Sequence, residues 1–93
     1  MKIYSDKKLK EIKFYKPSSF KDFRGEIWTK WDKKHFKNIK FNLSKFATSK
    51  KNVLRGFHGD TKSWKLVSCI EGKVLNVVVD YRKNSKNYLK HSS

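Results

Sequence analysis

Hydrophobic side chains occur along the chain in short runs that are separated by polar and turn-forming residues. The runs "EIKFY" (11–15) and "EIWTKW" (26–31) lie on either side of Pro17, the single proline, and each predicts a β-strand. The stretch "KFNLSKFATS" (40–49) places apolar residues at alternating positions, which is typical of a strand with one buried face. No stretch of about a dozen residues shows a helical apolar period, so the pattern favours an all-β fold.

The later part of the chain predicts the most buried strands. Three runs, 53–59, 64–70 and 73–81, each predict a strand, and the last is nearly continuous in Val and Leu, as expected for a strand at the centre of a packed sheet. The last two are joined by Glu71-Gly72, a tight-turn signal that predicts a hairpin. The polar stretch 32–38 predicts a short helical turn or a loop. We therefore expect one all-β domain over residues 1–93, with six or seven strands and short turns, as in a sandwich or a barrel.

The composition supports a small globular protein without a membrane span. Of the 93 residues, 37% are hydrophobic and 15% are aromatic, which is enough to build a modest core. The single cysteine, Cys69, excludes an internal disulfide and is expected to be a small buried residue. No apolar run approaches the roughly 20 residues that a membrane span requires, and the N-terminus lacks the apolar core of a signal peptide. These features predict a cytoplasmic protein.

The net charge of +16 raises nucleic acid as a partner, but the distribution of charge argues against it. Only Arg24, Arg55 and Arg82 are arginines, the residue type that usually makes bidentate contacts to phosphates and bases. Lysines are instead spread from Lys2 to Lys90. A small basic nucleic-acid-binding β-domain is therefore kept as a less favoured alternative.

The stretch "VLRGFHGD" (53–60) carries the first candidate for chemistry, His58. A lone histidine in an apolar strand is often structural. However, Gly56 can mark a bulge that redirects the following side chains, and Asp60 lies two residues after His58, where it can orient the imidazole and raise its pKa. An imidazole that titrates near neutral pH is a good general base.

Two further basic residues are candidates. Lys65 opens "KLVSCI", and is either an exposed lysine or an inward-facing one that stabilises a developing oxyanion. Arg24, followed by Gly25, is either an exposed turn residue or a phosphate contact.

Four segments, taken in order, resemble the dTDP-4-dehydrorhamnose 3,5-epimerase family of sugar-nucleotide epimerases. They are "FKDFRGEIW" (20–28), "SKKNVLRGFHGD" (49–60), "WKLVSCIEGKV" (64–74) and "VVVDYRKNSKNYLK" (77–90). The form "RGFHGD" is similar to epimerase-like members that process other keto-sugars, including GDP-linked 4-keto heptoses.

The resemblance implies a cupin barrel, also called a double-stranded β-helix, that usually forms a homodimer and needs no metal or organic cofactor. It also implies proton abstraction beside a C4 ketone, with an enolate intermediate. His58 would be the base, and Lys65 would stabilise the enolate oxygen. Arg24 and Arg55 would contact the diphosphate and neighbouring substrate atoms.

The sequence departs from the family in two places. Members of the family are nearly twice as long, and their catalytic tyrosine, as well as the aspartate that pairs with the histidine, lies beyond residue 93. Asp60 is then a substitute orienter and a candidate substrate contact. In addition, Leu43, Ser44 and Lys45 replace a glutamine and an acidic residue of dTDP-specific members.

A metal site is not expected. His58, Asp60 and Glu71 loosely resemble the metal-binding turn of a cupin, but the second histidine is missing.

The sequence therefore predicts the N-terminal half of a cupin-type epimerase, acting on a nucleoside-diphosphate 4-keto-6-deoxy sugar in carbohydrate or lipopolysaccharide biosynthesis. The site would be completed by a homodimer or by a partner chain that supplies the missing half. The alternative is a catalytically dead domain that binds a nucleotide sugar or a partner subunit.

Overall fold

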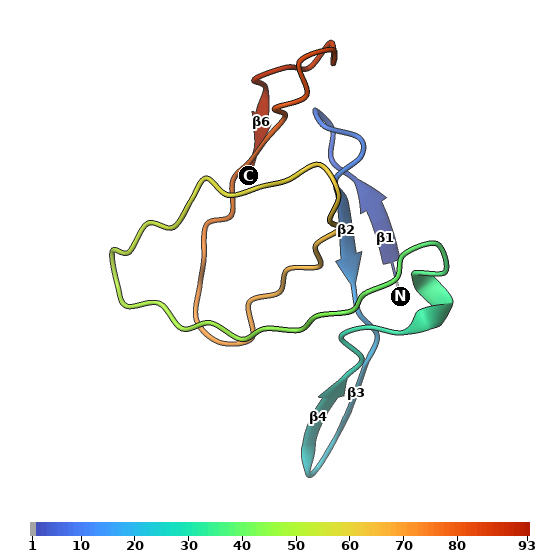
Figure 1. Ribbon diagram of the computed structural model, residues 1–93. Helices are drawn as coiled ribbons and strands as arrows, with labels where there is room; N and C mark the ends of the chain where they lie inside the picture. The colour runs from blue at the N-terminus through green and yellow to red at the C-terminus, as the bar shows by residue number, and fades with distance from the viewer. Residues whose placement is uncertain (1) are drawn as a thin grey trace. The chain divides into compact units, whose positions relative to one another are not determined.

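The computed structural model describes residues 2–93, and their regular structure is almost entirely β. Six short strands form three separate antiparallel hairpins, and the only helical element in this range is a three-residue 3-10 turn, η1 (Lys33–His35) (Figure 1). The strands are β1 (Lys2–Ser5), β2 (Lys13–Lys16), β3 (Ser19–Asp22), β4 (Gly25–Trp28), β5 (Val78–Val79) and β6 (His91–Ser92). The all-β prediction is confirmed.

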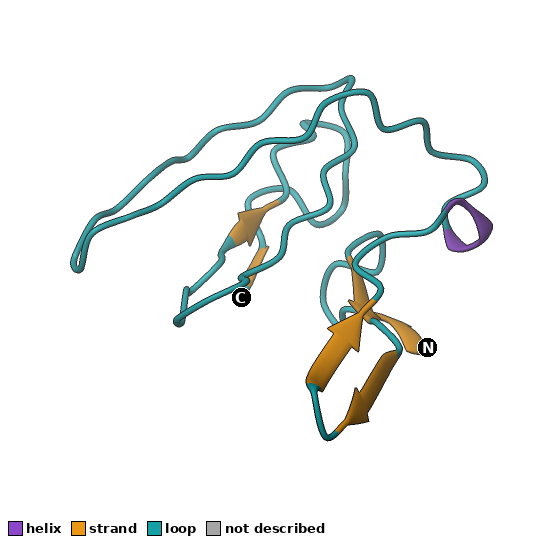
Figure 2. Ribbon diagram, turned by 90° about the horizontal axis from the view of Figure 1, so that it is seen from below, coloured by secondary structure: helices purple, strands orange, loops and turns teal. Residues whose placement is uncertain are grey.

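The chain divides into two compact units. The first contains the chain up to Asp32 together with Cys69–Ser93, and the second is Lys33–Ser68. All six strands belong to the first unit, whereas the second consists of η1 and connecting loops (Figure 2). A single cupin-like domain over residues 1–93 stays a prediction.

The hairpin β1–β2 forms because aromatic residues face one another across the two strands. Tyr4 lies opposite Phe14, and their rings stack with centroids 5.3 Å apart. Such cross-strand aromatic pairs stabilise antiparallel ladders. The connecting turn is fixed by Asp6, whose Oδ2 accepts hydrogen bonds from the backbone N–H groups of Lys8 and Leu9, each at 2.9 Å. Leu9 is thereby held inside the turn and is only 3% exposed.

The hairpin β3–β4 places Phe20 opposite Ile27 and closes at Gly25. Gly25 has a φ of 135°, a conformation that residues with a side chain rarely adopt. Both Phe20 and Ile27 are more than half exposed. Two-stranded hairpins are marginally stable alone, and each strand of residues 2–93 packs only against its own hairpin partner.

The C-terminal hairpin is short but is extended by further backbone hydrogen bonds. Val79 lies opposite His91, the N–H of Asp80 donates to the carbonyl of Lys90 at 2.9 Å, and the N–H of Leu89 donates to the carbonyl of Asp80 at 2.7 Å. The intervening loop is therefore closed at its base. The rings of Tyr81 and Tyr88 lie 5.8 Å apart within it.

Several strand predictions were wrong in extent. The predicted strands 11–15 and 26–31 correspond to β2 and β4, and the polar stretch 32–38 contains η1, as expected. In contrast, 40–49, 53–59 and 64–70 form no strand, and of 73–81 only Val78–Val79 does.

The turn predicted at Glu71-Gly72 is present, with a φ of 83° at Gly72, but the segments on either side of it form no ladder with one another. A strand requires a neighbour that satisfies its N–H and C=O groups. No sheet in residues 2–93 has more than two strands, so the described part of the chain forms hairpins and not a closed barrel, as expected of the N-terminal half of a cupin-type fold.

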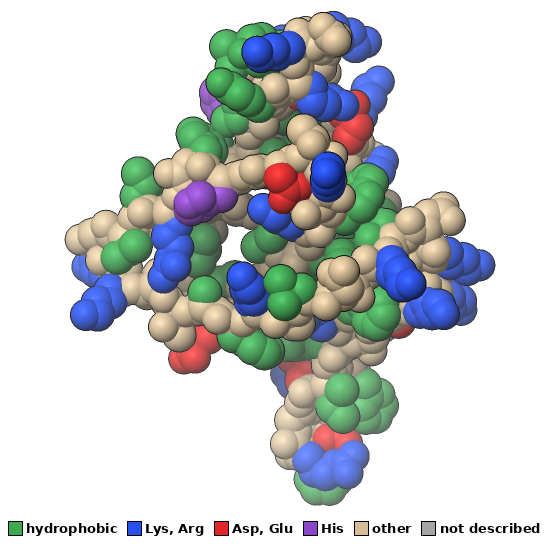
Figure 3. Space-filling model, viewed as in Figure 1, with side chains coloured by type: hydrophobic (Ala, Val, Ile, Leu, Met, Phe, Trp, Pro, Cys, Tyr) green, Lys and Arg blue, Asp and Glu red, His purple; other side chains and the backbone are tan. Residues whose placement is uncertain are grey.

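The described residues bury very little apolar surface. Leu9 is the one buried hydrophobic residue among them, and many aromatic and aliphatic side chains are exposed. Cys69, which we expected to be buried, is exposed and donates a hydrogen bond to the carbonyl of Glu71. Figure 3 shows green hydrophobic and blue basic side chains mixed on one face. No helix within residues 2–93 has the length and apolar character needed to cross a membrane.

Candidate functional site

Four of the five residues singled out from the sequence lie in one stretch of the second unit, residues 53–65, which we call the His58 segment. It contains Arg55, His58, Asp60 and Lys65, all of them exposed. Gly56 has a φ of 118°, a value that glycine adopts without steric cost. It lies in a loop and not in a strand, so the expected bulge is absent and its effect on the following side chains stays a prediction.

Arg55 is fixed by residues that precede it. Its Nε donates to Ser49 Oγ at 2.9 Å, and one Nη donates to the carbonyl oxygen of Thr48 at 2.8 Å. These two bonds connect the start of the His58 segment to residues 48–49. They also orient a permanently charged guanidinium that remains exposed to solvent.

Asp60 organises the turn between His58 and Lys65. Its Oδ1 accepts hydrogen bonds from the N–H groups of Lys62, at 2.8 Å, and Ser63, at 2.6 Å. These backbone donors, together with the positive charge of Lys65, hold the pKa of Asp60 below its usual value. No hydrogen bond joins Asp60 to His58 in the described part of the chain. The carboxylate that we expected to orient the base holds the turn instead.

His58 and Lys65 are both available to a ligand. Within residues 2–93, neither side chain makes a hydrogen bond or an ion pair with another protein group, and both residues are exposed. The Asp60 turn separates them along the chain and keeps them in the same unit. The segment therefore presents an imidazole and an ammonium group that make no hydrogen bond or ion pair within the described residues.

Arg24 lies in the first unit, in the turn between β3 and β4. Its guanidinium forms an ion pair with Asp22 at 2.7 Å, and its side chain is 72% exposed. The hydrogen bonds from the Arg24 side chain and backbone lower the pKa of Asp22. The local role of Arg24 is to close the turn together with Asp22, and its role as a substrate contact stays a prediction.

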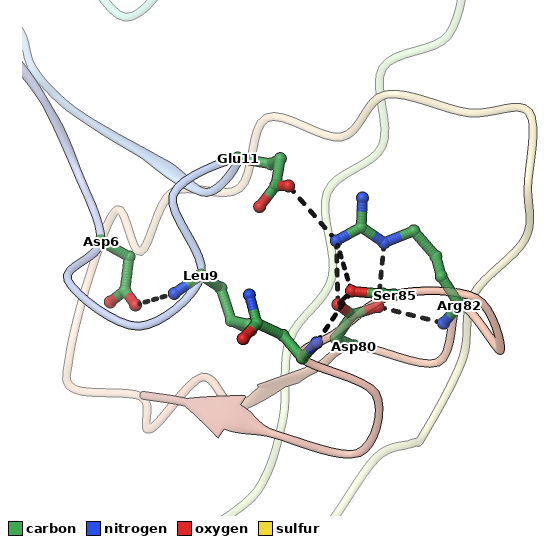
Figure 4. Close-up of polar contacts among 7 residues, drawn as sticks. Asp6, Leu9, Glu11, Asp80, Arg82 and Ser85 are labelled. Carbon is green, nitrogen blue, oxygen red and sulfur yellow. Dashed lines mark hydrogen bonds and ion pairs between the residues drawn. The ribbon is translucent and has the colours of Figure 1, made fainter.

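A well-connected polar group that we did not identify from the sequence lies in the first unit, and we call it the Asp80 network: Asp80, Arg82, Ser85 and Glu11 (Figure 4). The Asp80 side chain is 3% exposed. Arg82 donates from Nε to Asp80 Oδ1 at 2.9 Å and from Nη2 to Oδ2 at 2.8 Å, and Ser85 Oγ donates to Oδ2 at 2.7 Å. Arg82 also reaches Glu11 at 3.3 Å, across 71 positions of the chain.

The hydrogen bonds of the Asp80 network shift the pKa values of both Asp80 and Arg82. The side chain of Arg82, followed by that of Ser85, holds the pKa of Asp80 far below its usual value. The same carboxylate raises the pKa of Arg82. Aspartate followed closely by polar residues is a turn signal, so "DYRKNS" could have indicated the local part of the network. The contact with Glu11 depends on tertiary structure and has no local signal.

No group of three or more His, Cys, Asp or Glu side chains in residues 2–93 is arranged to hold a metal ion. The three residues that loosely matched a metal-binding turn, His58, Asp60 and Glu71, are not brought together as a ligand set.

Comparison with known proteins identifies the relatives of this chain. The sequence profile of the family described as dTDP-4-dehydrorhamnose 3,5-epimerase matches residues 6–93. The dTDP-4-dehydrorhamnose 3,5-epimerase of Salmonella typhimurium is 34% identical over 86 residues, covering 84% of this chain and 47% of the relative. The protein of the same name from Escherichia coli is 33% identical over 88 residues, covering 86% of this chain and 48% of the relative.

A third relative of the same name, from Neisseria gonorrhoeae, is 34% identical over 89 residues, which are 89% of this chain and 27% of that protein. No solved structure matches the chain. The chain thus spans about half the length, or less, of the curated relatives that it matches. The profile match over residues 6–93 and the resemblance of four ordered segments lead to the same assignment: the chain belongs to the dTDP-4-dehydrorhamnose 3,5-epimerase family, whose fold is of the cupin type.

Proposed function

We propose that this chain contributes the base and the enolate-stabilising cation of a sugar-nucleotide epimerase. The substrate class is a nucleoside-diphosphate 4-keto-6-deoxy sugar. His58 removes a proton from a carbon next to the ketone, and Lys65 stabilises the negative charge that develops on the ketone oxygen. The observation that carries the proposal is the family match over residues 6–93, which includes both residues.

The state of the two side chains supports these roles. A general base must accept a proton, so an imidazole already engaged by a protein donor would be a poor choice. His58 has no such partner in the described residues, and the ammonium group of Lys65 has no carboxylate in ion-pair contact with it there. Lys65 follows the Asp60 turn closely, so one short segment carries both groups.

The chemistry needs no redox step. The electron pair of the broken C–H bond forms the C=C bond of the enolate, and the ketone π electrons move to oxygen. The ammonium group of Lys65 donates a hydrogen bond to that oxygen, which carries more charge in the transition state than in the substrate. Return of a proton to the opposite face of the carbon inverts the centre and restores the ketone.

The remaining parts of the site are assigned by the resemblance. Arg55, which is already oriented by Thr48 and Ser49, and Arg24 contact the diphosphate. The relatives are named for a dTDP-linked sugar. Leu43, Ser44 and Lys45 replace the glutamine and the acidic residue of dTDP-specific members, so the base of the nucleotide that this chain binds can differ from thymine. The acid that acts on the opposite face, and the aspartate partner of the base, belong to the part of the family outside the aligned residues. We propose that a homodimer or a partner chain brings them to His58.

The test is hydrogen exchange with solvent. The purified chain is incubated with dTDP-4-keto-6-deoxyglucose in heavy water, and deuterium at C3 and C5 is followed by mass spectrometry. Exchange at one position requires only the base and the enolate stabiliser, so uptake is expected even without the acid on the opposite face. Uptake that is absent in a folded chain, with this sugar and with its GDP-linked counterpart, would contradict the proposal.

A binding role without catalysis is the second candidate, and the position of Asp60 favours it. In the described residues His58 lacks a carboxylate that would fix its tautomer, and such orientation contributes to base catalysis. Saturable binding of the nucleotide sugar without deuterium uptake would establish this role in place of catalysis.

A further inference from the structure

A second group of basic residues lies in the first unit, apart from any residue assigned above. It surrounds an open depression lined by Lys7, Lys8, Leu89, Lys90 and His91, which we call the basic depression. Lys7 and Lys8 come from the turn between β1 and β2, whereas the other three residues come from the end of the loop before β6 and from β6 itself. About 80 positions of sequence separate the two groups, so only the fold brings them together.

Defined hydrogen bonds hold both sides of the basic depression. Asp6 accepts from the N–H groups of Lys8 and Leu9, and its other oxygen accepts from Ser92 Oγ at 2.5 Å. On the opposite side, the carbonyl of Lys90 accepts from the N–H of Asp80 at 2.9 Å. The backbone that carries the three lysines is thereby fixed, and their flexible side chains extend from fixed points.

The charge of this depression is not balanced by its own lining. None of the lining residues is acidic. One carboxylate, Asp6, borders the depression, and hydrogen bonds, with that from the backbone N–H of Leu9 foremost, together with the charge of Lys8, lower its pKa. One carboxylate leaves the three lysines with a net positive charge. Three ammonium groups line this one hollow, so an anion placed between them is attracted by all three.

A second depression in the same unit shows the contrasting case. It is lined by Glu11, Arg82, Asn84, Ser85, Lys86 and Asn87. The guanidinium of Arg82 is already paired there with Asp80 and Glu11. Its charge is therefore neutralised within the protein, and the depression has no comparable need for an anion.

We infer that the basic depression binds an anion that carries several phosphate groups, such as a small oligophosphate. The ammonium group of lysine is a compact charge with three rotatable donors, which suits the many charged oxygens of a flexible phosphate chain. An oligophosphate of three groups matches three ammonium groups, and His91 adds a ring N–H donor at the edge. This site does not depend on the proposed epimerase chemistry, because it shares no residue with the His58 segment or with Arg24.

The test uses inorganic tripolyphosphate as the probe. Isothermal titration calorimetry at low salt is expected to show saturable binding by the whole chain, and amide NMR shifts are expected to concentrate at residues 7–8 and 89–91. The triple variant Lys7→Gln, Lys8→Gln, Lys90→Gln is expected to bind at least about tenfold more weakly, because each phosphate contact contributes a charge-assisted bond. Circular dichroism should show that the fold of the variant is unchanged, since all three lysines are exposed.

The matched control removes the same charge from the second unit, through Lys33→Gln, Lys34→Gln and Lys37→Gln. It should retain nearly the affinity of the unchanged chain. Equal weakening in both triple variants would show a general effect of net charge and overturn the inference, as would the absence of saturable binding.

Binding of a single-stranded RNA dodecamer tests whether the phosphate groups that the basic depression binds belong to a small oligophosphate or to a nucleic-acid backbone. Its binding should depend on the total charge and therefore fall equally in the two triple variants. RNA binding that is lost only in the first triple variant, together with no binding of tripolyphosphate, would overturn the inference in favour of nucleic acid.

Discussion

The Asp80 network and the His58 segment use charged side chains in opposite ways. In the first, a buried carboxylate accepts from Arg82 and Ser85, and Arg82 continues to Glu11, so the charges are neutralised by one another. In the second, the imidazole of His58 and the ammonium group of Lys65 have no such partner among the described residues and are exposed.

This difference separates charges that stabilise the fold from charges that remain available for chemistry. A group that is already satisfied within the protein gains little from a substrate, whereas an unsatisfied group can change its contacts during a reaction. Variants of the network should therefore alter stability, and variants of the segment should alter activity.

His58→Ala should have the largest effect on activity. Removing the base is expected to lower deuterium uptake by on the order of 10³-fold, a typical contribution of general base catalysis. The thermal midpoint should stay within about 2 °C of the unchanged chain, because the side chain is exposed and makes no hydrogen bond among residues 2–93. Uptake that persists in this variant would refute the assignment of the base.

Lys65→Gln should have the next largest effect on activity. The neutral amide is a weaker stabiliser of the enolate oxygen, so uptake should fall by on the order of 10²-fold. Affinity for the nucleotide sugar, measured by calorimetry, should change by less than about threefold, since the contact strengthens mainly in the transition state. An equal loss of affinity and of uptake would indicate a role in binding alone.

Asp80→Asn should produce the largest loss of stability. The substitution keeps the size of the side chain but removes the negative charge that Arg82 faces in a buried position. We expect the thermal midpoint to fall by more than about 5 °C, and amide exchange to become faster in residues 80–92. A midpoint equal to that of the unchanged chain would show that the network does not stabilise the first unit.

Acid should weaken the first unit through the same carboxylate. The pKa of Asp80 in the folded chain is depressed, so its stabilising contribution is complete above its ordinary value of 3.8 and is lost as the pH falls from there toward the folded value. Between about pH 4 and about pH 2, the midpoint should therefore fall more steeply in the unchanged chain than in Asp80→Asn. Parallel curves would contradict the assignment. Comparison of the two chains is required because Asp6, Glu11, Asp22 and Asp60 also have lowered pKa values.

Arg24→Gln should have the smallest effect on stability. The Arg24 side chain is largely exposed in its ion pair with Asp22, and pairs exposed on one side contribute little. The midpoint is expected to change by less than about 2 °C, and less still at high salt. A larger change would mean that the β3–β4 turn depends on this pair more than its exposure suggests.

The sequence predicted the local features of the fold better than its pairing. The strands at β2 and β4 follow from alternation and from aromatic residues, and the turn at Gly72 follows from a glycine in a tight turn. The ladders predicted for 53–59, 64–70 and 73–81 did not form, because an apolar run becomes a strand only where another strand satisfies its backbone. The sequence of an apolar run does not show whether residues 2–93 contain a strand that can pair with it.

The candidate site shows the same limit. The residue types of His58 and Lys65 were identified from motifs, and both lie in one segment. The role expected for Asp60 stays a prediction: among the described residues its Oδ1 accepts from the backbone N–H groups of Lys62 and Ser63, and no hydrogen bond joins it to His58. The link between Arg82 and Glu11 could not be anticipated, since it joins positions that are distant in the sequence.

The most direct test of this division measures two quantities in two variants. Deuterium uptake at C3 and C5 and the thermal midpoint are determined for His58→Ala and for Asp80→Asn, with uptake measured at a temperature where both are folded. We expect that His58→Ala loses uptake and keeps its midpoint, whereas Asp80→Asn keeps its uptake and loses stability. Retained uptake in His58→Ala, together with lost uptake in folded Asp80→Asn, would contradict this division of roles and would assign the chemistry to the Asp80 network.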